Sequence, residues 1–183
     1  MSKFKVSIRG TVPLLQARHL SPEEEKKITK ISIGKKKSRE LSDEEKFEMH
    51  AFKKLGKFYQ PSEMIEAAMV RAAVNFKLEG KKSYKDLMNG GIIIDPQEIP
   101  HKIQKFVVDA RWGKNPNTRG AIWVVRPRID KWELDFTINL LQDERITADI
   151  LRNILEYAGL YVGIGAWRPK YGRFEVIKFE EVK

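Results

Sequence analysis

The chain contains no cysteine and only three histidines among its 183 residues. Without cysteine it cannot form disulfides, thiolate metal sites or a cysteine nucleophile. No apolar run approaches the roughly 20 residues that span a bilayer, and the alternating, charged N-terminus does not resemble a signal peptide. These absences predict a cytoplasmic protein, in its own cell or in the host cytoplasm of a virus, with no membrane partner.

The sequence also lacks the short motifs that hold common cofactors. It has no P-loop, no dinucleotide fingerprint and no His-x-x-x-His pair. The acidic runs Glu23–Glu25 and Asp43–Glu45 are typical of helix N-termini. Asp109, Glu133 and Asp135 lie on predicted strands, where ion pairs with the many Lys and Arg are a simpler interpretation than a metal site. We therefore expect no cofactor, no metal and no catalytic residue.

What the chain has in excess is positive charge. Its formal net charge is +10, its pI is about 9.7, and 33% of its residues are charged. Such an excess favours polyanions such as DNA and RNA. The alternative is a protein from a host whose proteome is basic throughout. Hydrophobic residues make up 42% of the chain, which is enough for a core, and the length fits one domain.

Hydrophobic periodicity predicts both strands and helices. Apolar and polar residues alternate over segments that we assign as strands: 3–9, 92–94, 105–112, 121–128, 131–141 and 173–180. Helical spacing predicts a helix from Pro61 to about Phe76, and a second from its cap Thr147 to Ala158, ended by Gly159. The strands 105–112 and 121–128 would form a long hairpin with a polar tip at 113–120.

The order strand, helix, strands, helix, strand is that of ferredoxin-like and RRM-like folds. We predict an α+β fold with one antiparallel sheet, two helices on one face, a long β-hairpin and a glycine-rich loop before the last strand. RNA-recognition domains use the free face of such a sheet for nucleic acid. Residues 1–183 would form a single RRM-like domain with a flexible basic insertion at about 20–47, where the run Lys35–Lys37 is typical of mobile segments.

The glycine-rich loop Tyr161–Phe174 is the most informative segment. Its glycines allow the backbone to approach a ligand closely, its cations can contact phosphates, and its rings can stack on bases. The alternative is that these glycines pack the last helix on the sheet, with Trp167 buried. The loop residues that we predict to contact nucleic acid are Trp167, Arg168, Lys170, Tyr171 and Arg173.

A second group of candidate residues lies on the predicted hairpin. Arg126 and Arg128 share one face of a strand, because side chains alternate with a period of two, and could follow a phosphate backbone. The alternative is an edge strand whose charges prevent aggregation. The hairpin residues that we predict to contact nucleic acid are Arg111, Trp112, Lys114, Arg119, Arg126 and Arg128.

The layout resembles the RAMP superfamily of CRISPR-associated proteins, which carry RRM-like domains. Members often place a glycine-rich loop between the last helix and the last strand, where Gly159–Gly172 lies here, and project a basic hairpin from the middle of the sheet, like Arg111–Arg128. The phrase Gly165–Phe174, with Trp132–Phe136, is also similar to an uncharacterised group of phage and archaeal mobile-element proteins. The resemblance implies nucleic-acid binding and head-to-tail assembly into a homo-oligomer or a filament on the strand.

We therefore expect a non-enzymatic protein that binds single-stranded DNA or RNA with little dependence on sequence and strong dependence on salt. Two alternatives stay open. His19 follows the first strand, where CRISPR RNA-processing endonucleases of this fold carry a general-base histidine, so the resemblance also implies a metal-independent endoribonuclease. The other alternative is a viral structural or assembly protein that packs its basic surface around a genome.

Overall fold

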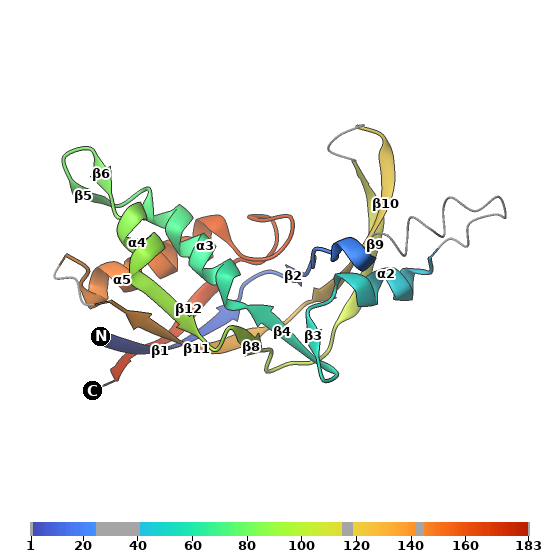
Figure 1. Ribbon diagram of the computed structural model, residues 1–183, viewed down its shortest axis with the longest axis horizontal. Coiled ribbons are helices and arrows are strands. Elements are labelled where there is room, and N and C mark those ends of the chain that lie inside the picture. The colour runs from blue at the N-terminus through green and yellow to red at the C-terminus, as the bar shows by residue number, and fades with distance from the viewer. Residues whose placement is uncertain (1, 25–40, 115–118, 142–144, 183) are drawn as a thin grey trace.

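The computed structural model describes residues 2–24, 41–114, 119–141 and 145–182. Figure 1 shows two parts along the long axis of the molecule. A main sheet covered by helices forms one end, and a β-hairpin beside a short helix forms the other. Both chain termini lie at the end formed by the main sheet.

The main sheet has four strands in the order β12-β1-β11-β7, with every neighbouring pair antiparallel. In this order the strands span Phe174–Val182, Ser2–Gly10, Glu133–Leu140 and Ile92–Asp95. Strand β1 forms where the sequence alternates, and its apolar residues Phe4, Val6 and Ile8 are all buried. Val6 lies opposite Phe136 of β11 and Phe179 of β12, so the strands share one apolar face.

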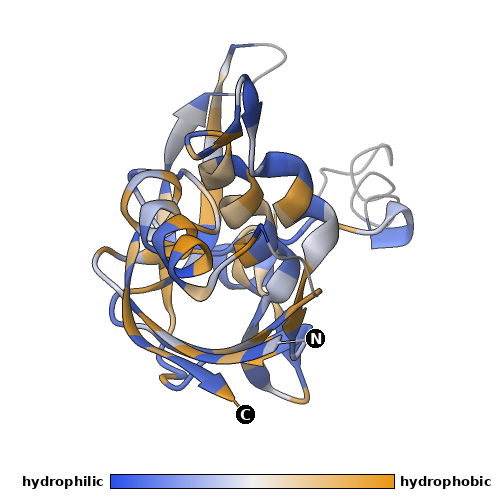
Figure 2. Cartoon of the chain, turned by 90° about the vertical axis from the view of Figure 1, so that its left-hand side faces the viewer, coloured by the Kyte–Doolittle hydropathy of each residue, from blue (hydrophilic) through white to orange (hydrophobic). Residues whose placement is uncertain are grey.

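Helices cover that apolar face. They are α3 (Ser62–Ala73), α4 (Lys85–Gly91), α5 (Ala148–Tyr157) and the π-helix η1 (Ala158–Val162). Figure 2 shows them on one side of the curved sheet. Ile65 of α3 and Leu151 of α5 are fully buried in the core with the strand side chains. The predicted α+β class with antiparallel pairing is confirmed, as is the cap at Thr147, which accepts a hydrogen bond from the Ile150 N–H.

Gly159 does not end the last helix, contrary to the prediction. The chain continues through η1 and leaves the helical conformation at Gly163, whose φ is +70°. A Cβ atom at Gly159 would collide with the backbone and ring of Phe174 in β12. Glycine at position 159 therefore allows the helix to approach the sheet closely, and it is Gly163 that provides the left-handed turn.

A small sheet lies between the two parts. Its strands are β3 (Lys53–Lys54), β4 (Lys57–Pro61) and β8 (Glu98–Pro100), in the order β3-β4-β8, and a separate two-stranded hairpin is formed by β5 (Lys77–Glu79) and β6 (Lys82–Ser83). The buried amide of Gln16 donates to the Tyr59 carbonyl at 2.8 Å and accepts from the Phe52 N–H at 3.0 Å. These hydrogen bonds fix the chain after β1 against the small sheet.

The long hairpin consists of β9 (Val107–Lys114) and β10 (Ala121–Ile129). With the short strand β2 (Leu14–Leu15) it forms a sheet of its own in the order β2-β10-β9, so it does not project from the middle of the main sheet as expected. Strand β9 starts and ends later than the predicted 105–112, because its pairing with β10 runs from Val107, opposite Arg128, to Lys114, opposite Ala121. The indole of Trp132 donates to the Val12 carbonyl at 2.9 Å and anchors the base of the hairpin.

Helix α2 (Asp43–His50) lies beside the hairpin, and its first residues belong to the predicted insertion at about 20–47. A capping box starts this helix: the Ser42 hydroxyl accepts from the Glu45 N–H, and the Glu45 carboxylate accepts from the Ser42 N–H. The helix buries no residue, but Asp43 accepts a hydrogen bond from the Trp123 indole at 2.9 Å. Residues 25–40 of the predicted insertion lie outside the described residues.

Candidate functional site

The glycine-rich loop is held against β2 by its backbone. The Ala166 N–H donates to the Leu15 carbonyl at 2.8 Å, and the Gly172 N–H donates to the Pro13 carbonyl at 2.9 Å. Gly165 and Gly172 have φ values of +75° and +72°, and a Cβ atom at either would collide with backbone. The glycines therefore serve a close backbone approach within the chain itself, and this approach presents the segment 167–171 beside the hairpin.

Rings of the loop contact cations of the hairpin. The Arg126 guanidinium lies 4.5 Å from the centre of the Trp167 ring, and that of Arg111 lies 5.1 Å from it. Arg111 also donates a hydrogen bond to the Tyr171 hydroxyl at 2.7 Å. These residues come from segments far apart in the sequence, and cation–π contacts join them into one surface.

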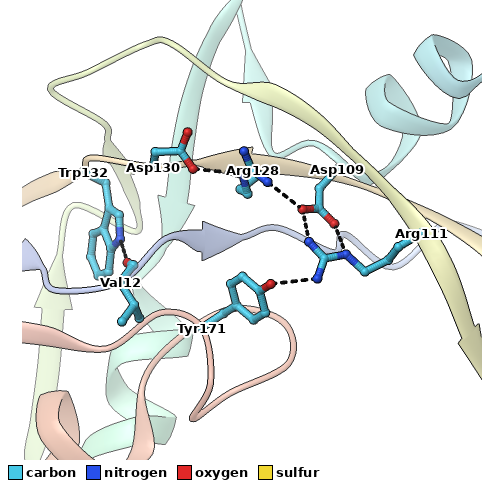
Figure 3. Close-up of polar contacts among 7 residues, drawn as sticks. All are labelled: Val12, Asp109, Arg111, Arg128, Asp130, Trp132 and Tyr171. Carbon is cyan, nitrogen blue, oxygen red and sulfur yellow. Dashed lines mark hydrogen bonds and ion pairs between the residues drawn. The ribbon is translucent and has the colours of Figure 1, made fainter.

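Asp109 neutralises two of the predicted cations. Its carboxylate is buried, accepts two hydrogen bonds from Arg111 and lies 3.1 Å from Nη1 of Arg128 (Figure 3). The hydrogen bonds to Asp109 raise the pKa of Arg111, and Arg128 also pairs with Asp130 at 2.8 Å. Arg111 and Arg128 are thus part of an internal network that supports the hairpin.

Two other predicted cations have no such neutralisation. Within the described ranges, neither Arg126 nor Arg168 forms an ion pair with a carboxylate. Burial lowers the pKa of Arg126, and its Nη1 atom is buried without a hydrogen-bond partner in the described part of the chain. Burial and the nearby charge of Arg71 lower the pKa of Arg168. The charge of Asp109, opposite Arg126 on β9, offsets only part of the effect of burial on Arg126. A bound anion would stabilise the charged form of both arginines.

The remaining predicted contact residues stand outside this cluster. Trp112, Lys114, Arg119 and Lys170 are exposed, with Trp112 packed edge-on against Trp123 at 5.3 Å between ring centres. Arg173 donates to the Pro169 carbonyl at 2.7 Å, so one of its nitrogens holds the loop in shape. The hairpin tip at 115–118 lies outside the described residues.

Two adjoining pockets flank the cluster and share Ala17 and His19 in their walls. One, of about 330 Å³, lies between the loop and α3 and includes Arg168. The other, of about 440 Å³, lies between β10 and α2 and includes Trp123 and Arg126. We call these two pockets, with the loop and hairpin residues that border them, the hairpin–loop surface.

Sequence reasoning missed several residues of the larger pocket. Its lining includes Arg18 and three residues of α2, namely Lys46, Met49 and His50. The first part of this helix lies in the segment predicted from the sequence to be a flexible insertion. The only available signal was the capping-box pattern Ser42-x-x-Glu45, which marks a helix start but not its neighbours. His50 is half-buried; burial lowers its pKa, and its Nδ1 atom lies 3.2 Å from the Arg18 carbonyl oxygen.

The face of the main sheet away from the helices differs from the predicted nucleic-acid face. Several of its charges pair with one another: Arg9 with Glu133 at 2.6 Å, and Lys102 with Asp135 at 2.8 Å. RNA-recognition domains stack bases on aromatic side chains of this face. The outward residues of the two central strands include no aromatic residue: Lys3, Lys5, Ser7 and Arg9 on β1, and Glu133, Asp135, Thr137 and Asn139 on β11.

Comparison of the chain with models of known protein families and with curated protein sequences finds no match. Within the described ranges, no helix is long and apolar enough to cross a membrane. The same residues contain no group of three or more His, Asp or Glu side chains placed to hold a metal ion. The chemistry of the hairpin–loop surface is therefore the basis for a functional hypothesis.

Proposed function

We propose that the protein binds single-stranded nucleic acid along the hairpin–loop surface, mainly through the phosphate backbone. The observation that carries this proposal is the pair Arg126, which is half-buried, and Arg168, which is exposed. Neither has a carboxylate partner in the described part of the chain, and both border the adjoining pockets. A strand that lies across both pockets would bring its phosphates to these guanidinium groups. The net charge of +10 favours the same class of partner.

We also propose that the main sheet is a ferredoxin-like core. The strand order β12-β1-β11-β7 and the helices on one face support it. The position of the glycine-rich loop between η1 and β12 supports the kinship with RAMP proteins that the sequence suggests. In this proposal the nucleic acid lies beside the sheet, in contact with the loop and the hairpin, and copies of the protein assemble along the strand.

The direct test is binding of nuclease-treated protein to fluorescent single-stranded DNA, single-stranded RNA and duplex DNA across a salt series. We expect tight binding to a single strand that weakens linearly in log Kd against log salt concentration. Sedimentation of the complex with strands of increasing length gives the number of copies bound. Equal, weak binding to all three nucleic acids would contradict the proposal, because generic charge does not distinguish them.

A metal-independent ribonuclease is the second candidate, favoured by one specific observation. His19 and His50 both line the larger pocket, and the contact between His50 Nδ1 and the Arg18 carbonyl leaves Nε2 as the proton acceptor. Burial lowers the pKa of His50 and so keeps the ring neutral at pH 7. His50 would take the proton of a ribose 2′-hydroxyl, the 2′-oxygen would attack phosphorus to form a 2′,3′-cyclic phosphate, and His19 would protonate the departing 5′-oxygen.

Incubation of labelled RNA with the protein in EDTA tests this second candidate. Cleavage that leaves 2′,3′-cyclic ends, is lost in His50→Ala and in His19→Ala, and spares a strand with 2′-deoxyribose would establish it. RNA that stays intact although it is fully bound would show that the protein binds RNA without cleaving it.

A further inference from the structure

The larger pocket lies along an open strand edge. Its lining includes every residue of β10 from Ile122 to Arg126. Consecutive side chains of a strand point to opposite faces, so a pocket that touches all of them must lie at the edge between the faces. This is the edge away from β9, and β2 pairs with it only at Arg128 and Ile129. The pocket therefore lies along the part of the β10 edge, from Ile122 to Arg126, with which β2 does not pair.

This edge presents backbone hydrogen-bonding groups to the pocket. The Pro127 carbonyl accepts from the Gln16 N–H at 2.9 Å on the side away from β9. In an antiparallel strand, the N–H and C=O groups of every second residue point to the same side, and the β9–β10 register is regular throughout. The N–H and C=O groups of Val125 and Trp123 therefore point toward the pocket, and no strand in the described part of the chain pairs with them.

The other walls of the pocket combine apolar side chains with the basic side chains of Arg18, Lys46 and the two histidines. Leu20, Leu41 and Met49 line it opposite β10. Arg18, also in the lining, is paired with Glu24 at 2.8 Å, whereas Arg126 keeps its buried Nη1 atom unpartnered within the described ranges. A ligand that fits would be flat and largely apolar on its faces, would carry donors and acceptors on one edge, and would bear a negative charge nearby.

We propose that this pocket holds one nucleobase of the bound strand and selects it through the backbone edge of β10. The inference rests on the proposed function, and it adds a preference for one base to a mainly phosphate-directed interaction. A base edge offers the donors and acceptors that the N–H and C=O groups of Val125 and Trp123 complement. The apolar walls take the faces of the base, and Arg126 is placed for the adjoining phosphate. The volume of about 440 Å³ is within the range of small-molecule sites.

Binding of fluorescent oligo-dA, oligo-dC and oligo-dT of equal length tests the proposal by anisotropy. We expect the wild-type affinities for the best and worst base to differ by at least about fivefold, the low end for hydrogen-bonded recognition of a base edge. Met49→Trp fills the pocket from α2, a helix that buries no residue, so the fold is preserved. In this variant the affinities should converge on that of the least preferred base, within about twofold.

Leu55→Trp is the matched control, because it adds the same ring without a change of charge at a side chain that is 96% exposed and outside the pocket. It should keep the wild-type spread of affinities. Equal wild-type affinities for the three strands, or an unchanged spread in Met49→Trp, would overturn the base pocket while leaving strand binding in place. Absence of salt-sensitive binding to any strand by the wild type would instead overturn the proposed function itself.

Discussion

The face of the main sheet that lies away from the helices, here called the open face, carries arginines and lysines, and so does the hairpin–loop surface. The charges of the two regions are arranged differently. On the open face, Arg9 pairs with Glu133 and Lys102 pairs with Asp135. On the hairpin–loop surface, Asp109 neutralises Arg111 and Arg128, whereas Arg126 has no carboxylate partner in the described part of the chain. Surface ion pairs contribute little to stability and leave little charge for a ligand. The comparison teaches that the pairing of cations, more than their number, distinguishes a candidate site from an ordinary solvated face.

Changes in pH should separate the buried interior beside the small sheet from the open face most strongly. Burial lowers the pKa of His101, which follows β8 of the small sheet and whose Nε2 atom lies 3.4 Å from Nε2 of Gln16, to about 4. The unfolded chain takes up this proton near pH 6.5, so the stability from neutral His101 is complete above pH 6.5 and is lost as the pH falls toward 4. The loss is roughly 3 kcal/mol at pH 4.

Urea midpoints at pH 7, 5 and 4 measure this loss. The fall between pH 6.5 and 4 should shrink in His101→Gln, because the titrating group is gone. On the open face, the hydrogen bond from Arg9 lowers the pKa of Glu133, so Glu133 reduces the stability only when the pH falls below its ordinary pKa of 4.5. The control variant Glu133→Gln should therefore show the same fall in stability as the wild type above pH 4.5. An equal fall in wild type and His101→Gln would show that the buried ring is not its cause.

Removal of Arg126 and Arg168 is expected to have the next largest effect. Arg126→Ala with Arg168→Ala should weaken single-strand binding roughly 100-fold at low salt and reduce the salt dependence, because two charge-assisted contacts to phosphate are lost. Lys5→Ala with Lys178→Ala on the open face removes the same formal charge and should change the affinity less than about threefold. Fluorescence anisotropy of both variants over a salt series makes the comparison, and equal losses would mean that only net charge matters.

Asp109 tests the internal network of the hairpin. In Asp109→Asn the guanidinium groups of Arg111 and Arg128 lose their shared counter-charge, and we expect a destabilisation of about 2 kcal/mol in chemical denaturation. Asp135→Asn on the open face removes an exposed partner of Lys102 and should cost less than about 1 kcal/mol. Similar costs for both variants would remove the energetic distinction between the two regions.

Gly165 tests the shape of the loop with the smallest expected effect. Its φ of +75° and the collision of an added Cβ with the Leu15 carbonyl predict a loss of about 1–2 kcal/mol for Gly165→Ala, with weaker binding because Arg168 shifts. Gly90→Ala in α4, where a Cβ would meet no atom within 4 Å, should be neutral or slightly stabilising. Thermal melts and anisotropy follow both, and an undisturbed Gly165→Ala variant would contradict the strained approach to β2.

Much of the fold is predictable because local patterns carry it. The alternation of Phe4, Val6 and Ile8 places β1, and the caps at Ser42 and Thr147 mark the starts of α2 and α5. The separate sheet of the hairpin is not predictable in this way. It depends on the pairing of Leu14 and Leu15 with β10, two residues that show no strand period of their own.

The basic charge, the absence of cysteine chemistry, the main strands and helices, and the cluster of glycines, rings and cations before the last strand are all evident from the sequence. Which of the described cations have a carboxylate partner follows only from the three-dimensional structure. Arg111 and Arg126 lie on the same face of one hairpin, yet Asp109 takes two hydrogen bonds from Arg111 and forms no ion pair with Arg126. That His19 and His50 share a pocket also follows only from the three-dimensional structure. The physical reason is that ion pairs and pockets depend on three-dimensional distances between side chains, many of them from separate elements, and no local pattern encodes these distances.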